Sequence, residues 1–193
     1  TDKEDLSPQK VLSYALNEAV KTLVFHEPAP LFAAAMQGKE DEVANLLTQE
    51  VDVNERAAAG WNALLAATAQ GYPKIMKRLL DAGANPDIGN LHSITPIMYA
   101  ARYGNVESCK LLLDYGADIN LQDWSDQTAL MVATRTGHVE VAAMLIDAGA
   151  DLTIKDEESR SALDICTQLK QGQIAKLIRA ASKKRQQLTN LNL

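Results

Sequence analysis

The sequence is poor in cysteine and in aromatic residues. Of its 193 residues, two are cysteines, Cys109 and Cys166, and 5% are aromatic. Two cysteines far apart, with no CxxC or Cys/His spacing around them, exclude a disulfide scaffold and favour a reducing, cytoplasmic compartment. Because a reactive thiol needs polar, electropositive and accessible surroundings, we interpret both cysteines as small buried hydrophobes.

Long apolar runs and an excess of positive charge are also missing. No run of about 18 apolar residues occurs, so the sequence predicts no membrane insertion. The start, TDKEDLSPQK, is polar and acidic, unlike a signal peptide. Without an initiating Met, it favours a processed chain or one excised from a longer protein. The net charge of −6 argues against a nucleic-acid-binding surface. We interpret the basic run KKR at 183–185 as a solvated helix end, and the alternative is that it attracts nucleic acid or an anionic membrane.

The clearest feature that is present is an internal repeat. The segments TPIMYAARYGNVESCKLLLDYGADIN from Thr95 and TALMVATRTGHVEVAAMLIDAGADLT from Thr128 align without a gap, 33 residues apart. Further copies in the same register begin at Ala29, Asn62 and Ser161. Five copies at one period indicate an array of stacked units, because a single unit of this size cannot bury its own apolar face.

Each copy predicts two helices. Thr95, Thr128 and Ser161 can cap the first helix through their hydroxyls and Asn62 through its amide, whereas Ala29 cannot. The glycines expected to end the first helix are Gly38, Gly71, Gly104 and Gly137. An aliphatic second helix then ends at Gly83, Gly116 and Gly149, and an extended hairpin with a polar tip leads to the next copy.

This pattern resembles the ankyrin repeat, whose signature runs T-P-L-H-x-A-A, then G-H, L-L and G-A-D-x-N. The resemblance covers about residues 29–181 and implies an all-α solenoid of paired helices joined by β-hairpin-like loops. The repeats would span 29–61, 62–94, 95–127, 128–160 and 161–182. Glu50 replaces the terminal glycine of the first copy, so we expect its second helix to end differently. In the last copy, Lys170 replaces the mid-repeat glycine and Asp164 replaces an apolar residue near the start. Both changes suit a terminal copy with one side facing solvent.

Both ends of the array need a cover. Residues 1–28 contain the segment SPQKVLSYALNEAVKTLVF, 7–25, which has a Ser-Pro helix start and apolar residues at helical spacing. We expect it to cap the first repeat, and a partner-binding helix is the alternative. Residues 183–193 are predicted to be a polar tail that frays.

No candidate for catalysis or metal binding has a suitable context. His138 occupies the G-H position, where histidine bonds to local backbone, and His26 and His92 lie in connections without a metal-ligand spacing. The glycines never cluster as a phosphate loop. We interpret the carboxylates Asp156-Glu157-Glu158 as a solvated hairpin tip. The sequence therefore predicts no enzyme, no cofactor, no metal and no small-molecule substrate.

The resemblance implies that partners bind a concave face formed by the hairpin tips and the exposed side of the first helices. On that face, we expect Trp61 and Trp124 to be displayed, because Trp, Tyr and Arg are enriched at binding hot spots. In the alternative, each indole folds down over its neighbours. The candidate partner-binding residues are Trp61, Leu91, His92, Ile94, Arg102, Tyr103, Trp124, Ser125, Gln127 and Arg135. We expect a partner with an apolar anchor and with a carboxylate near the two arginines.

The function predicted is a non-enzymatic module that binds another protein through this face. The alternative is a targeting or regulatory domain of a larger protein. The family resemblance also offers Asn54 and Asn120, in LLTQEVDVN and LLDYGADIN, as sites of oxygenase hydroxylation. Their alternative role is to stabilise the hairpins.

Overall fold

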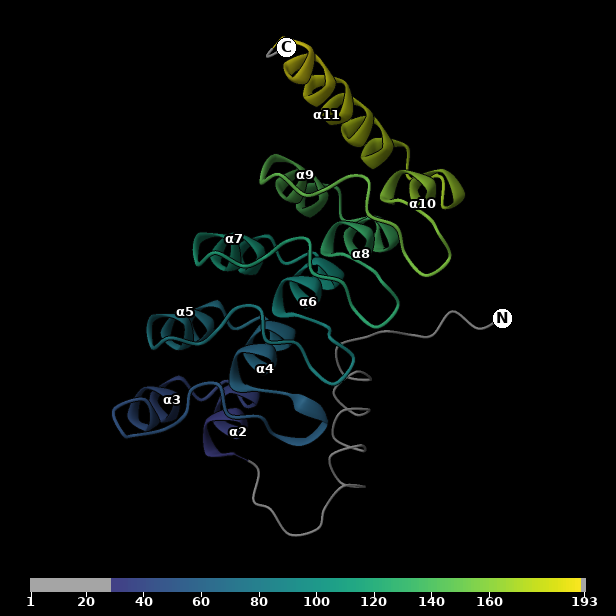
Figure 1. The fold of residues 1–193 in the computed structure, drawn as a ribbon. Helices are drawn as coiled ribbons and strands as arrows, with labels where there is room; N and C mark the ends of the chain where they lie inside the picture. The colour runs from purple at the N-terminus through teal and green to yellow at the C-terminus, as the bar shows by residue number, and fades with distance from the viewer. Residues whose placement is uncertain (1–28, 192–193) are drawn as a thin grey trace.

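The computed structural model describes residues 29–191, so residues 1–28, with the predicted capping helix 7–25, and residues 192–193 lie outside the described part. Its helices form five successive pairs (Figure 1). The pairs are α2 (Pro30–Met36) with α3 (Glu40–Leu46), α4 (Ala63–Gln70) with α5 (Pro73–Asp81), α6 (Pro96–Tyr103) with α7 (Val106–Asp114), α8 (Ala129–Thr136) with α9 (Val139–Asp147), and α10 (Ala162–Gln168) with α11 (Gly172–Leu191). One 3-10 turn, η1 (Ala58–Gly60), lies in a connection, and residues 29–191 contain no strand.

The pairs stack in two layers (Figure 1). The first helices α2, α4, α6, α8 and α10 lie side by side, and each packs on its neighbour. The second helices α3, α5, α7, α9 and α11 form the other layer, with the hairpin tips at the opposite side of the stack. The predicted all-α solenoid is therefore confirmed.

Small and aliphatic side chains fill the space between the layers. Ala67 and Ala101 are buried on the first helices and let neighbouring helices approach closely, while Leu79, Leu112 and Leu145 recur on the second helices and are fully buried. Each such leucine contributes roughly 1.5–3 kcal/mol of hydrophobic stabilisation. The 33-residue period thus places equivalent side chains in one continuous core.

The predicted N-caps are present with one exception. The side chains of Asn62, Thr128 and Ser161 accept a hydrogen bond from the backbone N–H three residues on, at 2.8, 3.4 and 3.3 Å. The prediction for Thr95 is wrong, because its hydroxyl makes no cap bond and its oxygen is buried without a hydrogen-bond partner among the described residues. The N–H of Met98 is instead bonded to the Thr95 carbonyl, at 3.1 Å.

The first and last copies differ from the middle ones. Helix α3 has 7 residues, whereas α5, α7 and α9 have 9, which confirms that the copy with Glu50 ends its second helix differently. At the other end, α11 continues to Leu191, so residues 183–191 are helical, not the predicted frayed tail. Arg185 holds this helix by donating to the carbonyls of Ala150 and Ile146, at 2.8 and 2.9 Å, beside the C-terminal end of α9, where a positive charge is favourable.

Candidate partner-binding surface

The hairpin tips are stacked by their backbones. Each tip closes on itself through backbone hydrogen bonds, and a further backbone hydrogen bond joins each tip to its neighbour. The bonds between tips run from Leu91 N to Ala59 O at 3.0 Å, from Trp124 N to His92 O at 3.0 Å, and from Glu157 N to Ser125 O at 3.2 Å. A continuous, ordered edge results along the stack.

A short polar side chain fixes three of the four tips. Asn90, Asp123 and Asp156 occupy one register position, and the Oδ1 atom of each accepts hydrogen bonds from two backbone N–H groups of its own tip. This local bonding is typical of Asn and Asp in turns. The first tip has Ala57 at the same position, which offers no such acceptor.

Three side chains form an exposed group on the middle tips. Leu91 is 72% exposed and Trp124 is 70% exposed, and the rings of His92 and Trp124 lie with centroids 5.4 Å apart. We call Leu91, His92 and Trp124 the tip patch. The prediction that Trp124 is displayed is confirmed.

The same prediction for Trp61 is wrong. Its side chain is 5% exposed and its ring packs against Tyr99, with centroids 5.1 Å apart. The partner ring lies on α6, far from Trp61 in the sequence, which is why the residues near Trp61 gave no sign of it. Burial raises the pKa of Tyr99, and the hydroxyl of Tyr99 accepts a hydrogen bond from Asn90 at 3.2 Å.

The remaining candidate residues differ in how exposed they are to solvent. Ser125 is buried, so its side chain is not part of an open surface, while Ile94, Gln127 and Arg102 are half-buried. Tyr103 stacks on Tyr99 with centroids 6.5 Å apart, and burial raises its pKa. Of the predicted set, the tip patch and Arg135 are the exposed members.

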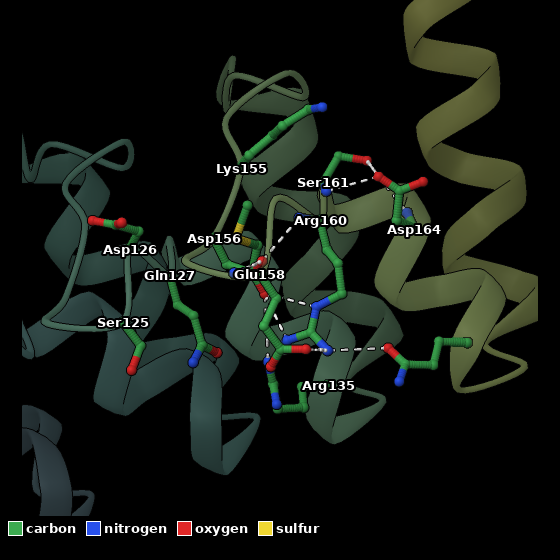
Figure 2. Close-up of polar contacts among 12 residues, drawn as sticks. Ser125, Asp126, Gln127, Arg135, Lys155, Asp156, Glu158, Arg160, Ser161 and Asp164 are labelled. Atoms are coloured by element: carbon green, nitrogen blue, oxygen red, sulfur yellow. Dashed lines mark hydrogen bonds and ion pairs between the residues drawn. The ribbon is translucent and has the colours of Figure 1, made fainter.

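The prediction of a solvated acidic tip is confirmed for Glu157 and Glu158, which are exposed, but it is wrong for Asp156 (Figure 2). Asp156 is 5% exposed, because its carboxylate accepts hydrogen bonds from the Arg160 guanidinium at 2.8 and 3.0 Å. Arg135 approaches the same carboxylate to 3.8 Å, and Glu158 pairs with Arg160 at 2.7 Å. Burial opposes ionisation of Asp156, but the bonds from Arg160 outweigh it and lower its pKa.

The side chains of His138, Cys109 and Cys166 pack or bond within the stack. The Nε2 atom of His138 lies 3.1 Å from the carbonyl oxygen of Arg102, so it bonds to the preceding repeat rather than to local backbone. Cys109 and Cys166 are buried and free, and burial raises the pKa of the Cys109 thiol to about 12. Residues 29–191 hold no group of three His, Cys, Asp or Glu side chains placed to bind a metal; His26 lies outside them.

The two candidate hydroxylation sites join successive connections. The side-chain oxygen of Asn54 accepts from Asn85 N and that of Asn120 from Asp151 N, both at 2.8 Å. This bonding is the hairpin-stabilising role expected as the alternative. Hydroxylation of either side chain stays a prediction.

Comparisons with known proteins agree with this architecture. The family model described as "Ankyrin repeats (3 copies)" matches residues 11–90, 31–123 and 97–187. Among curated relatives, the chain is 39% identical over 62 residues to the Mitochondrial disaggregase of Bos taurus, covering 32% of this chain and 9% of that protein. It is 35% identical over 83 residues to the human Ankyrin repeat and SOCS box protein 3, and the match covers 42% of this chain and 16% of that protein. It is 37% identical over 62 residues to the human Protein phosphatase 1 regulatory subunit 27, and the match covers 32% of this chain and 40% of that protein.

These matches span less than half of each relative's length. Within the described part of the chain, no helix has the length and apolar character needed to cross a membrane. Ankyrin repeats act generally as protein–protein interaction modules. The family match covers most of the sequence and agrees with the stacked helix pairs, so the chain belongs to the ankyrin repeat family.

Proposed function

We propose that the chain is a non-enzymatic module that binds another protein through the tip patch. The observation that supports this proposal is the exposure of two large apolar side chains, Leu91 and Trp124, on adjacent tips. The stack does not need either side chain for its core. Exposed apolar groups that lie together in this way mark interaction sites more often than isolated ones.

The tips are also ordered before any partner arrives. Backbone bonds hold Leu91 and Trp124 to their neighbours, and Asp123 fixes the turn that carries Trp124. Little conformational entropy is then lost at the site on binding, which favours affinity. A rigid indole in an ordered turn has the properties of a binding hot spot.

The basic residues of the first-helix face suggest the chemistry of the partner. Arg135, with its side chain 43% exposed, lies one repeat beyond Arg102 on the first-helix face. Its guanidinium is 3.8 Å from the buried carboxylate of Asp156, a separation that leaves N–H donors for a second carboxylate. We propose a partner segment with an apolar or aromatic side chain against Trp124 and an Asp or Glu close to Arg135.

Substitution of the tip patch tests this proposal. Affinity capture with the full chain identifies a binding protein, and calorimetry then measures its Kd for Trp124→Ala, Leu91→Ala and the control Leu169→Ala. Leu169 is 43% exposed but lies at the end of α10, away from the middle tips. We expect Trp124→Ala to weaken binding by about 30-fold or more, as for a hot-spot residue, with no change for the control. Unchanged affinity in folded Trp124→Ala protein would reject the tip patch.

A second candidate function is that the array positions another domain within a longer protein. It is supported by the small share of each relative that the chain matches, from 9% to 40% in the three cases above. Immunoblotting of the native source with an antibody to the chain tests it. A polypeptide much larger than 21.0 kDa supports this role, and one of that mass counts against it.

A further inference from the structure

The surface of the hairpin tips changes from apolar to acidic along the stack. At one register position, the four tips carry Ala58, Leu91, Trp124 and Glu157, and the last three of these side chains are exposed. The hydrogen bond from Glu157 N to Ser125 O, at 3.2 Å, joins the last tip to the tip that carries Trp124. A carboxylate therefore follows the tip patch directly, on the side of the last repeat.

The acidic residues of the last two tips fall into two kinds. Asp123 and Asp156 fix their turns, because each accepts hydrogen bonds from two backbone N–H groups of its own tip. Asp126 and Glu157 are exposed, and within residues 29–191 their carboxylates have no hydrogen bond or ion pair to another side chain. The first two carboxylates hold the fold together, and the other two do not.

The backbone does not require a carboxylate at either exposed position. Asp126 has φ +57°, in the left-handed region, and the same register position in the first tip is Gly60. A side chain with a Cβ is disfavoured there relative to glycine. At the position of Glu157, the two preceding tips carry the apolar residues Leu91 and Trp124. The fold thus does not account for these two charges, and both are open to a partner.

The basic side chains of the last tip do not compensate these charges. Arg160 pairs with Asp156 and with Glu158, at 2.8 and 2.7 Å between nitrogen and oxygen. The side chain of Lys155 points away from Asp126 (Figure 2). An acidic surface therefore remains beside the tip patch, although the first-helix face next to it carries arginines.

We propose that the partner segment lies along the tips and places a Lys or Arg against Asp126 and Glu157, next to its apolar anchor at Trp124. This inference rests on the proposed function, because it concerns the same surface, and it adds the charge and the spacing of the partner's residues. Complementary charges favour the correct partner and its orientation, and like charges exclude others. The acidic residue expected near Arg135 contacts α8 instead of the tips, so the segment carries charges of both signs.

The spacing of the repeats predicts where the basic residue lies in the partner. Neighbouring packed helices are roughly 8–10 Å apart, and successive tips are separated by about the same distance. Since an extended chain advances about 3.3 Å per residue, roughly three residues of the partner reach from Trp124 to Glu157. About three more reach from Trp124 back to Leu91. The expected segment has two apolar residues and one Lys or Arg at these intervals, in either chain direction.

Selection of peptides on the full chain tests this expected sequence. A random peptide library is selected for binding to the wild-type protein, and peptides that also bind the Trp124→Ala variant are removed. We expect the remaining peptides to share the predicted spacing of apolar and basic residues. Selection on the Glu157→Lys variant should enrich Asp or Glu at the position of the basic residue.

Neutral variants then measure the contribution of each charge. Calorimetry gives the Kd of the strongest peptide for Glu157→Gln, for Asp126→Gly and for the control Glu140→Gln, whose exposed carboxylate lies on α9. We expect each tip variant to weaken binding about two- to fivefold at low salt. The difference from the wild-type protein should shrink at about 1 M salt, where charges are screened, and the control should bind as the wild-type protein does.

Two results would overturn the inference and leave the proposed function intact. One is a set of peptides that depends on Trp124 but has no basic residue at the predicted spacing. The other is an unchanged Kd for both neutral tip variants. Peptides that bind the Trp124→Ala variant as tightly as the wild-type protein, or a library that yields no binder, would reject the tip patch and this inference together.

Discussion

The close contact between the mid-repeat turns of repeats three and four leads to a prediction about stability. Gly104 has φ +65°, and a Cβ atom there would overlap Nδ1 of His138 and lie 2.7 Å from its Cε1. Gly116 has φ +78° but no atom within 4 Å of such a Cβ. Substitution by alanine therefore separates backbone strain, present at both sites, from the contact with the next repeat, present at Gly104.

The expected losses follow from these two contributions. Left-handed strain costs about 1–2 kcal/mol for a residue with a Cβ, which is the whole effect for Gly116→Ala. Gly104→Ala also displaces the His138 ring and its bond to the Arg102 carbonyl, worth roughly 0.5–1.5 kcal/mol. With the packing lost around the ring, we expect a total of about 2–4 kcal/mol.

Urea unfolding followed by circular dichroism measures these differences, and comparison of the m values checks that each transition keeps its cooperativity. In a His138→Ala background, Gly104→Ala should lose its extra effect and resemble Gly116→Ala, giving a coupling of about 1–2 kcal/mol. Equal losses for the two glycine variants, or no coupling to His138, would refute the view that the histidine joins repeats three and four.

Two further predictions concern Asp156 and the cysteines. Because the pKa of Asp156 is lowered in the fold, its contribution to stability is present above the ordinary Asp pKa of about 3.9 and is lost as the pH falls through the folded value. Asp156→Asn should lower the free energy of unfolding by about 1–3 kcal/mol at pH 7 and by less at pH 3. Asp123→Asn, which places at that tip the residue found at Asn90, should leave the free energy of unfolding nearly unchanged. Equal losses for the two variants in chemical unfolding would contradict this prediction. Burial raises the pKa of the Cys109 thiol to about 12, and it also raises the pKa of the Cys166 thiol. A thiol reagent at pH 8 should therefore leave both cysteines unmodified until urea unfolds the chain. Fast labelling of the native protein would contradict this prediction.

Much of the architecture could be predicted from the sequence because its causes are local and repeated. The 33-residue period predicts helix starts and ends without knowledge of distant contacts. A polar residue precedes every first helix except α2, and a glycine follows every first helix except α10. Asn62 and Ser161 cap as predicted, since their side chains act on their own helices. Thr95 differs because the N–H it would cap is already bonded to its own carbonyl.

The surface was harder to predict because exposure depends on residues far apart in sequence. Trp61 and Trp124 occupy similar stretches of polar and small residues, yet Tyr99, distant in the sequence, covers Trp61 while Trp124 remains open. Asp156 belongs to a run of acidic residues that suggested a solvated tip, but Arg160 and Arg135 fold back onto it. The predicted cytoplasmic location stays a prediction, since one relative is named mitochondrial.

Fluorescence of Trp124 in the Trp61→Phe variant tests most directly whether partners bind at the tip patch. Trp124 is then the single tryptophan of the chain, and the residue is 70% exposed. We predict that acrylamide quenches Trp124 strongly in the free protein and only weakly when a captured partner is bound. The partner must have no tryptophan, or its own tryptophan emission must be silenced by labelling. Equal quenching of Trp124 in the free and bound states would contradict the proposed binding surface.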